Sequence, residues 1–425
     1  MVGRAASLSG RFMRLVGTWC AIGAVCLIGA TSPTPAQSRA DRERAAASQR
    51  VPELSQKALR YNEAKRLANE GVVSITASGR TTAYSQFAED IRNVIEALPN
   101  NNMRIVPIMG KSAGQNLLDI LYLRGIDMGI VDQDILQYFK RQDPEFYGDL
   151  EKRVNFVTKL FNSEFHLVAK NDIKTLEDLR GKQVSCLMQM STVALLCENI
   201  FRLLKIDVKI VYEDVDLAML RLKKGEVAAA ARAGSVPVPG FNGITAADNL
   251  HFVPIDEESL PKSDFNPIRA AYLPSRLRAE DYPNMIPAGE SVPTVATSTL
   301  LAVYAWPPEG RQYQEIGQFI QLFFANIDKF RSAPRHPKWR DVNLAADVPG
   351  WTRFSAAQAW LDSRRSAEPA PPSITPGDPK MKAAFEKFIS DLAKSQGDRT
   401  FSPEQKETLY AQFLTWWETV GKTRR

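Results

Sequence analysis

The chain has 425 residues, 44% of them hydrophobic, and a net charge of +6. That length and composition are enough for one large hydrophobic core or two of medium size. The basic residues are scattered and form no stripe interleaved with aromatic side chains, which argues against a nucleic-acid-binding protein. Beyond residue 36 the sequence contains no run of 18 uncharged apolar residues, so we expect the mature protein to be soluble.

The first 36 residues have the pattern of a secretory signal peptide. Arg4, Arg11 and Arg14 form a basic region, residues 15–30 carry no charge, and small residues precede a cleavage site after Ala36. An uncleaved membrane anchor is the alternative, because the apolar run is rather long for a signal. Cleavage would lower the net charge to +3. We therefore expect a secreted protein.

Residues 37–71 are predicted to form a charged linker followed by a helix that begins near Pro52. Three strands follow, at residues 72–77, 103–108 and 128–131, and helices separate them. Short connections between alternating strands and helices predict an α/β sheet that is mostly parallel. Ligands on such sheets bind beyond the carboxyl ends of the strands, where loops meet helix N-termini.

The segment from Phe165 to Ile206 is the most informative part of the chain. An apolar strand at 165–168 leads to a short helix at 175–180, a strand at 183–185 and a helix at 191–204. Thr175 and Asp178 have the spacing of a capping box, and Gly181 suits the left-handed residue after a helix. This order is typical of the crossing between the lobes of a two-lobed receptor. A plain strand–helix unit of any α/β domain is the alternative.

Similar signals continue to the end of the chain. Strands are expected at 208–212 and 227–231, and the apolar segment 292–306 is expected to return to the first half. We predict a first lobe made of residues 72–168 and 295–365 and a second lobe of residues 169–294. A proline-rich linker (366–380) and a helical tail (381–425) would follow. Trp416 and Trp417 of this tail would pack on the protein body or form a surface for a partner.

Two cysteines, Cys186 and Cys197, remain after the signal peptide. One would end a strand and the other would lie about two turns into the next helix. A bridge is permitted in a secreted protein. Because helix and sheet axes are about 10 Å apart, the geometry is tight, and we favour two buried thiols.

The order of motifs resembles the extracytoplasmic solute receptors of TRAP transporters, specifically the TAXI group. The similarity extends from about Val72 to Leu361 and comprises Lys111–Leu117, Gly125–Asp134, Ile173–Val184, Lys224–Val227 and Val292–Val295. The resemblance implies a two-lobed, periplasmic-binding-protein-like α/β fold with hinge crossover strands, here with a C-terminal helical extension. It also implies a monomer that binds a small organic anion, of carboxylate or acidic amino acid type, and delivers it to integral-membrane permease subunits.

Two loops depart from the pattern of that family. The loop at 78–84 has one glycine, and the loop Leu187–Thr192 has none, where the family's loops are glycine-rich. Glycine allows backbone N–H groups to approach an anion closely. The alternative is therefore a sensor or assembly factor on the same scaffold, with a degenerate pocket and working through its C-terminal helices.

Candidate ligand-binding residues come from loops of both lobes. Each group contains one arginine, which can hold a carboxylate through two parallel N–H bonds, and hydroxyls near helix N-termini. The alternative is that the arginines are solvated and the hydroxyls are ordinary N-caps. The predicted ligand-binding residues are Arg80, Thr81, Thr82, Tyr84, Ser112 and Gln115 from the first lobe, and Gln189, Ser191, Thr192 and Arg232 from the second.

Other titratable residues indicate no catalytic or metal site. Asp132 and Asp134 are expected to act at a helix N-terminus, with a calcium or acid–base role as the alternative. His166, His251 and His336 lack the spacing of metal ligands. Without a convergent nucleophile, base or metal set, we predict that the protein is not an enzyme and needs no cofactor.

Overall fold

The computed structural model describes residues 56–79, 82–238, 240–241, 243–260 and 264–367, together with residues 385–386, 389, 402–403, 406–407 and 409–410. The predicted signal peptide, most of the proline-rich linker and the tryptophans of the tail lie outside these residues. Residues up to Leu67 and residues from Ala68 onward form two separate compact units. Helix α2 (Gln56–Asn69) has no buried residue. The features below belong to the second unit.

Ten strands of the described residues form one sheet. In spatial order β2, β1, β3, β10, β4, β7, β5 and β6 lie side by side, while β8 pairs with β4 and β9 with β10. The strands are β1 (Val72–Ala77), β2 (Arg104–Met109), β3 (Met128–Asp132), β4 (Val154–Lys170), β5 (Gln183–Ser185), β6 (Lys209–Val211), β7 (Ala229–Gly234), β8 (Leu250–Phe252), β9 (Leu273–Arg278) and β10 (Ser291–Tyr304).

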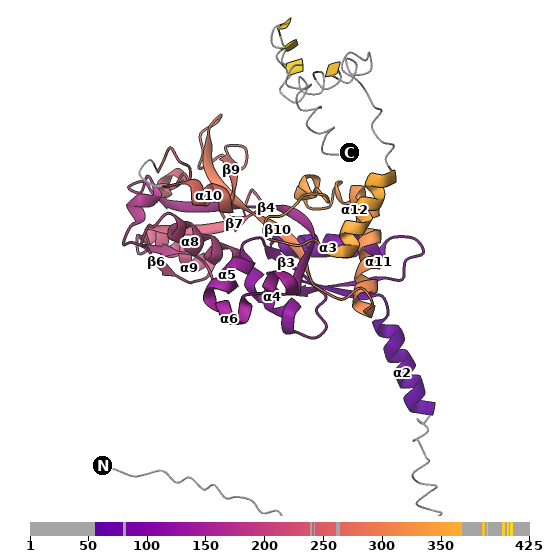
Figure 1. The fold of residues 1–425 in the computed structure, drawn as a ribbon. Coiled ribbons are helices and arrows are strands. Elements are labelled where there is room, and N and C mark those ends of the chain that lie inside the picture. The colour runs from indigo at the N-terminus through magenta and orange to yellow at the C-terminus, as the bar shows by residue number, and fades with distance from the viewer. Residues whose placement is uncertain are drawn as a thin grey trace, which may run out of the picture. The chain divides into compact units, whose positions relative to one another are not determined.

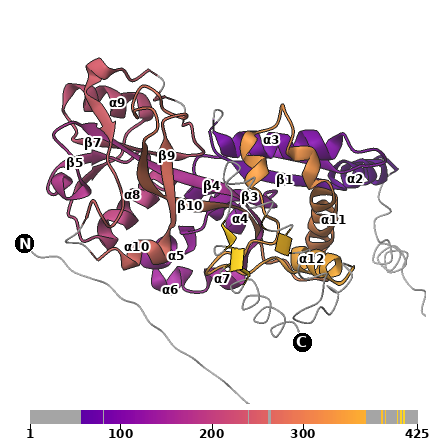
Figure 2. The ribbon, with the colours of Figure 1, turned by 90° about the horizontal axis from the view of Figure 1, so that it is seen from above.

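The helices connect and cover these strands (Figures 1 and 2). They are α3 (Ala83–Glu96), α4 (Ala113–Tyr122), α5 (Ile135–Gln142), α6 (Pro144–Tyr147), α7 (Leu150–Arg153), α8 (Thr192–Leu203), α9 (Val215–Lys224), α10 (Asn266–Ala271), α11 (Arg311–Ala325) and α12 (Ser355–Ala367). The described residues also include four short 3₁₀ helices: η1 (Leu176–Leu179), η2 (Ala246–Asp248), η3 (Ile327–Phe330) and η4 (Pro337–Asp341).

Two groups of parallel strands define two lobes. In the first lobe β1 pairs with β2 and β3, and in the second β5 pairs with β6 and β7, all in parallel. Each lobe has its own core: Phe87 of α3 stacks on Trp339 in the first, and α8 packs on the strands of the second. The predicted two-lobed α/β fold is confirmed. The residue boundaries of the lobes remain a prediction.

Two long antiparallel strands, β4 and β10, run between the lobes (Figure 2). The first part of β10 pairs with β9, and residues 299–303 pair with β3. Strand β4 pairs with β10 up to Glu164 and with β7 from Glu164 to Ala169. The β4–β10 register shifts twice, between Thr299 and Leu300 and between Leu301 and Ala302. Such irregularities bend a strand, so these positions suit a hinge.

Several local predictions are confirmed. Thr175 and Asp178 form a capping box at η1, and Gly181 has a φ of +74°.

The length of β4 was not predicted: it begins at Val154, eleven residues before the expected strand at Phe165. Buried polar residues such as Ser163 and Glu164 interrupt the apolar pattern there.

The prediction of two free thiols is wrong, because Cys186 and Cys197 are bonded to each other. Their Cα atoms are 6.2 Å apart. Cys186 directly follows β5, and Cys197 lies on the face of α8 that packs against this strand, so both side chains enter the core of the second lobe. This packing brings the two sulfur atoms within bonding distance.

Candidate functional site

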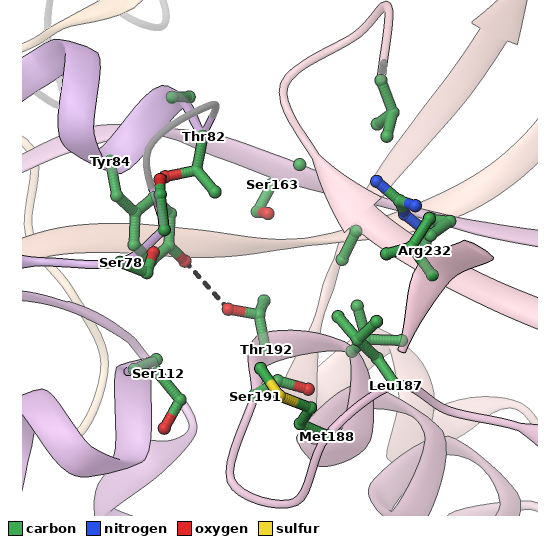
Figure 3. A pocket seen from close by; sticks show the side chains of 18 of the residues that line it. Ser78, Thr82, Tyr84, Ser112, Ser163, Leu187, Met188, Ser191, Thr192 and Arg232 are labelled. Atoms are coloured by element: carbon green, nitrogen blue, oxygen red, sulfur yellow. Dashed lines mark hydrogen bonds between the residues drawn. The ribbon is translucent and has the colours of Figure 1, made fainter. Parts of the chain in front are cut away.

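A cavity of about 310 Å³ lies between the loops of the two lobes (Figure 3). Hydroxyl groups and small or apolar side chains form most of its wall. The lining residues are Ser78, Gly79, Thr82, Ala83, Tyr84, Lys111, Ser112 and Ala113 from the first lobe, Ser163 of β4, and Leu187, Met188, Ser191, Thr192, Val193, Asp214, Val215, Arg232, Ala233, Gly234, Ser235 and Val238.

Four helices begin at this cavity. Thr82, Ser112, Ser191 and Asp214 are the N-cap residues of α3, α4, α8 and α9, and each side chain accepts a hydrogen bond from a backbone N–H of its own helix. The N-terminus of a helix carries a partial positive charge and attracts anions. The hydroxyls of Thr82, Ser112 and Ser191 therefore cap helices that begin at the cavity. The same arrangement places the N-terminal ends of four helices at one cavity, although the cap of α9, Asp214, is itself an acid.

Two basic residues line the cavity among the described residues. Lys111 is exposed, whereas Arg232 of β7 is partly buried, and this burial lowers its pKa. In Figure 3 the Arg232 side chain lies on the side of the cavity away from Tyr84. Its neighbour on β4, His166, is uncharged, since burial lowers the pKa of this imidazole to about 3. Arg232 is therefore the buried cation at this wall.

Tyr84, Asp132 and Thr192 form a compact group of oxygen atoms at the opposite wall. The Tyr84 hydroxyl lies in short contact with Asp132 Oδ1 and 3.0 Å from Thr192 Oγ1 (Figure 3). Thr192 Oγ1 is 2.6 Å from Asp132 Oδ2, and Thr299 donates to Oδ1 over 3.3 Å. Asp132 and Tyr84 belong to the first lobe and Thr192 to the second. The group therefore joins the lobes.

Asp134 forms a second connection between the lobes. It occupies the N-cap position of α5 but makes no side-chain capping bond, and it accepts a hydrogen bond of 3.0 Å from the Tyr272 hydroxyl. That hydroxyl in turn accepts a bond of 2.7 Å from Asn199 of α8. Asp134 therefore lies at a helix N-terminus as expected, although its carboxylate bonds to Tyr272 and does not cap α5. Asp132 is the last residue of β3, and the expectation is wrong for this residue. Their strand ends at the lobe interface, where partners from the other lobe come within reach.

A third connection involves backbone groups. The N–H of Gly114, in the first turn of α4, donates to the carbonyl of Met190 over 3.0 Å. A Cβ atom at Gly114 would lie 2.6 Å from the Met190 Cβ, closer than real carbon atoms approach. Only glycine allows this contact. Met190 therefore packs against the first lobe, while Met188 lines the cavity.

The structure brings together six of the ten predicted site residues. Thr82, Tyr84, Ser112, Ser191, Thr192 and Arg232 line the cavity. Gln115 bonds to Asp119 on its own helix, and Gln189 is exposed; neither lines the cavity. Arg80 and Thr81 lie outside the described residues.

Sequence reasoning missed part of the wall. Ser163 and Ser235 come from positions where the crossing strands β4 and β7 meet, and no local motif marks them. Leu187 and Met188 belong to the loop in which the family's glycines are missing, and their side chains line the cavity. Asp214 is the N-cap of α9, and an acid directly before a predicted helix was the available signal.

Residues 75–349 match the model of the NMT1-like family, and the chain belongs to that family. No match was found among curated proteins.

Solved structures similar to this chain include three binding proteins. They are an ancestral arginine-binding protein bound to arginine (15% identity, TM-score 0.36, 60% of this chain and 93% of that chain) and the aliphatic sulphonate binding protein SsuA from Escherichia coli (16%, 0.36, 77% and 87%). The third is the alkanesulfonate-binding protein SsuA from Xanthomonas axonopodis pv. citri bound to MOPS (14%, 0.35, 78% and 95%).

Among the described residues, no helix is both long and apolar enough to cross a bilayer. The same residues contain no cluster of three or more histidine, cysteine or acidic side chains arranged to hold a metal ion.

Proposed function

We propose that this chain is a periplasmic solute receptor that captures a small organic anion in the cavity between its lobes. The anion would be of the carboxylate or acidic amino acid type. Receptors of the TAXI group of TRAP transporters, which the sequence resembles, deliver such a ligand to membrane permease subunits, and we propose the same partner here. The protein would act as a monomer after removal of its signal peptide.

The observation that carries this proposal is the convergence of three helix N-termini capped by hydroxyl groups (α3, α4 and α8) and Arg232 on one cavity. Helix N-termini and a guanidinium group both favour negative charge, and their effect increases where apolar walls exclude water. Leu187, Val193 and Val238 supply such walls. The two crossing strands with their register shifts allow the lobes to close around a ligand.

Binding can be measured by isothermal titration calorimetry with the mature protein, stripped of ligand by unfolding and refolding. The panel is succinate, glutamate and hexanesulfonate. Arg232→Ala should weaken binding of the tightest ligand roughly 10- to 100-fold, because a hydrogen bond to a charged group is worth about 1.5–3 kcal/mol. Arg269→Ala, a substitution on exposed α10 away from the cavity, is the matched control. Absence of binding by every member of the panel would contradict the proposal.

One observation favours the second candidate, a sensor or assembly factor. Leu187 and Met188 place side chains at the cavity where the family's loop has glycines. In that case the C-terminal helices would form the functional surface. Removing the residues after Ala370 would then abolish function in cells while the lobes keep their thermal stability and no panel ligand binds.

A further inference from the structure

We propose that Asp132 holds a proton when the two lobes are in contact, so that closing the cavity around an anion takes up a proton. The inference concerns the regulation of the proposed binding site and rests on the proposed function for the anion. The proton itself is a property of the closed lobes and can be measured without a ligand.

The first argument is a count of hydrogen atoms. Three oxygen atoms of Tyr84, Asp132 and Thr192 are in mutual contact, each pair within hydrogen-bonding distance. Tyr84 and Thr192 have one hydroxyl hydrogen each. If Asp132 is ionised, both hydrogens point to its carboxylate. The contact of 3.0 Å between Tyr84 Oη and Thr192 Oγ1 then contains no hydrogen.

A proton on Asp132 gives every contact one hydrogen. Oδ2 then donates to Thr192 Oγ1, Thr192 donates to Tyr84 Oη, and Tyr84 donates to Asp132 Oδ1. Thr299 also donates to Oδ1, which leaves Oδ2 as the oxygen that holds the proton. The three hydroxyl groups thus form a closed cycle of hydrogen bonds across the lobe interface.

The surroundings of Asp132 also favour the neutral acid. Its side chain is fully buried, and its described hydrogen-bond partners are all hydroxyl groups. The titratable groups facing it are Tyr84 from α3 and Asp134 after β3, while α8 and β10 contribute only threonines. Burial, and then the like charge of Asp134, raise the pKa of Asp132 to about 7.

The proton is linked to closure because the cycle needs both lobes. When the lobes separate, Thr192 of α8 leaves Asp132, and water reaches the carboxyl group. Its pKa then returns toward the ordinary value of 3.8. An anion in the cavity beside Tyr84 and Thr192 also favours the neutral form of Asp132, because an ionised Asp132 carboxylate behind these two side chains would repel the anion.

The sign of the pH dependence follows. Protonation of Asp132 strengthens anion binding because the pKa of Asp132 is higher in the closed form than in the open form. This gain in affinity is fully present at a pH below the pKa of the open form. It is lost as the pH rises toward the pKa of the closed form, about 7. Between these limits, affinity falls up to about tenfold per pH unit. Above this range it reaches a plateau.

The test uses glutamate, or hexanesulfonate if glutamate does not bind, because both keep their charge between pH 6 and pH 8. Calorimetry at pH 6 in two buffers of different ionisation enthalpy measures proton uptake directly. Wild type should take up nearly one proton per ligand bound. Asp132→Asn should take up none and should bind with pH-independent affinity, because its amide can donate to Thr192 and accept from Tyr84. Binding without proton uptake by wild type, or an unchanged pH dependence in Asp132→Asn, would overturn the inference.

A ligand-free measurement separates this inference from the proposed function. If no panel member binds, the ¹³C resonance of the Asp132 carboxyl group is followed against pH in the free protein. A midpoint near 7 supports the inference even though the receptor function fails. The measurement is made on protein whose small-angle X-ray scattering profile matches the closed lobes. In that protein a midpoint near the ordinary carboxyl value overturns the inference. Comparison of the spectra with those of Asp132→Asn assigns the resonance.

Discussion

At the scale of single residues, two positions of the loop Leu187–Thr192 depart from ordinary backbone geometry. Leu187, which lines the cavity, and Met190, which packs against the first lobe, have φ angles of +61° and +58°, a region that favours glycine. Both lie in the loop from which the glycines of the family pattern are missing. The loop therefore keeps a glycine-like path with larger residues, at a cost of about 1 kcal/mol or more for each.

Tyr272→Phe should destabilise the protein in a pH-dependent way. The Tyr272 hydroxyl bonds to Asp134, and burial raises the pKa of this carboxyl group. Loss of the bond leaves the ionised form without this partner, so the free energy of unfolding should fall by about 1–3 kcal/mol at pH 8. The loss should shrink as pH falls and Asp134 becomes protonated in the folded state.

Urea unfolding at pH 5 and pH 8 measures this difference. Tyr122→Phe is the matched control, because Tyr122 is exposed and its hydroxyl meets only Arg153. An equal loss of stability at both pH values would show that the bond does not depend on the charge of Asp134.

At the scale of elements, the unit β5–loop–α8 carries much of the cavity wall. Its loop is closed at both ends: Cys186 and Cys197 are bonded, and the Ser191 hydroxyl caps α8. A bond between residues that are 11 apart in sequence restricts the unfolded chain and stabilises the fold by roughly 2–3 kcal/mol.

Reduction should therefore lower stability. We expect dithiothreitol to lower the free energy of unfolding of wild type by roughly 2–3 kcal/mol in urea titrations. The double variant Cys186→Ala, Cys197→Ala should start near the reduced value and should not respond to the reductant. A wild type that is equally insensitive would contradict the disulfide.

At the scale of the whole second unit, one of the contacts between the lobes described above places Gly114 against Met190. Gly114→Ala should push the lobes apart because its Cβ cannot occupy the position 2.6 Å from the Met190 Cβ. Small-angle X-ray scattering should show a larger radius of gyration, and anion affinity should fall at least tenfold. Gly243→Ala, where an added Cβ meets nothing within 4 Å, is the control. An unchanged radius of gyration would show that the contact between Gly114 and Met190 does not hold the lobes together.

The amount of this structure that could be predicted depended on the sequence distance between interacting residues. Helix α8, η1 and strand β5 follow from local periodicity and capping, and six predicted residues do reach one cavity. The partners of Asp132 are residues 84, 192 and 299, and no local pattern joins them. The disulfide could not be predicted because it depends on the distance between α8 and β5. Hydrophobic periodicity indicates which face of a helix is buried, but it does not give the distance between the helix and the strand.

The loop with two positive φ angles has a consequence for ligand choice. The side chains of Leu187 and Met188 form part of the wall, and the neighbouring disulfide restrains the backbone of the loop. The size of these two side chains therefore limits the volume available to a ligand. Substitution of Leu187 and Met188 can therefore adapt the cavity to smaller or larger solutes without a change in the hinge or in the helix N-termini.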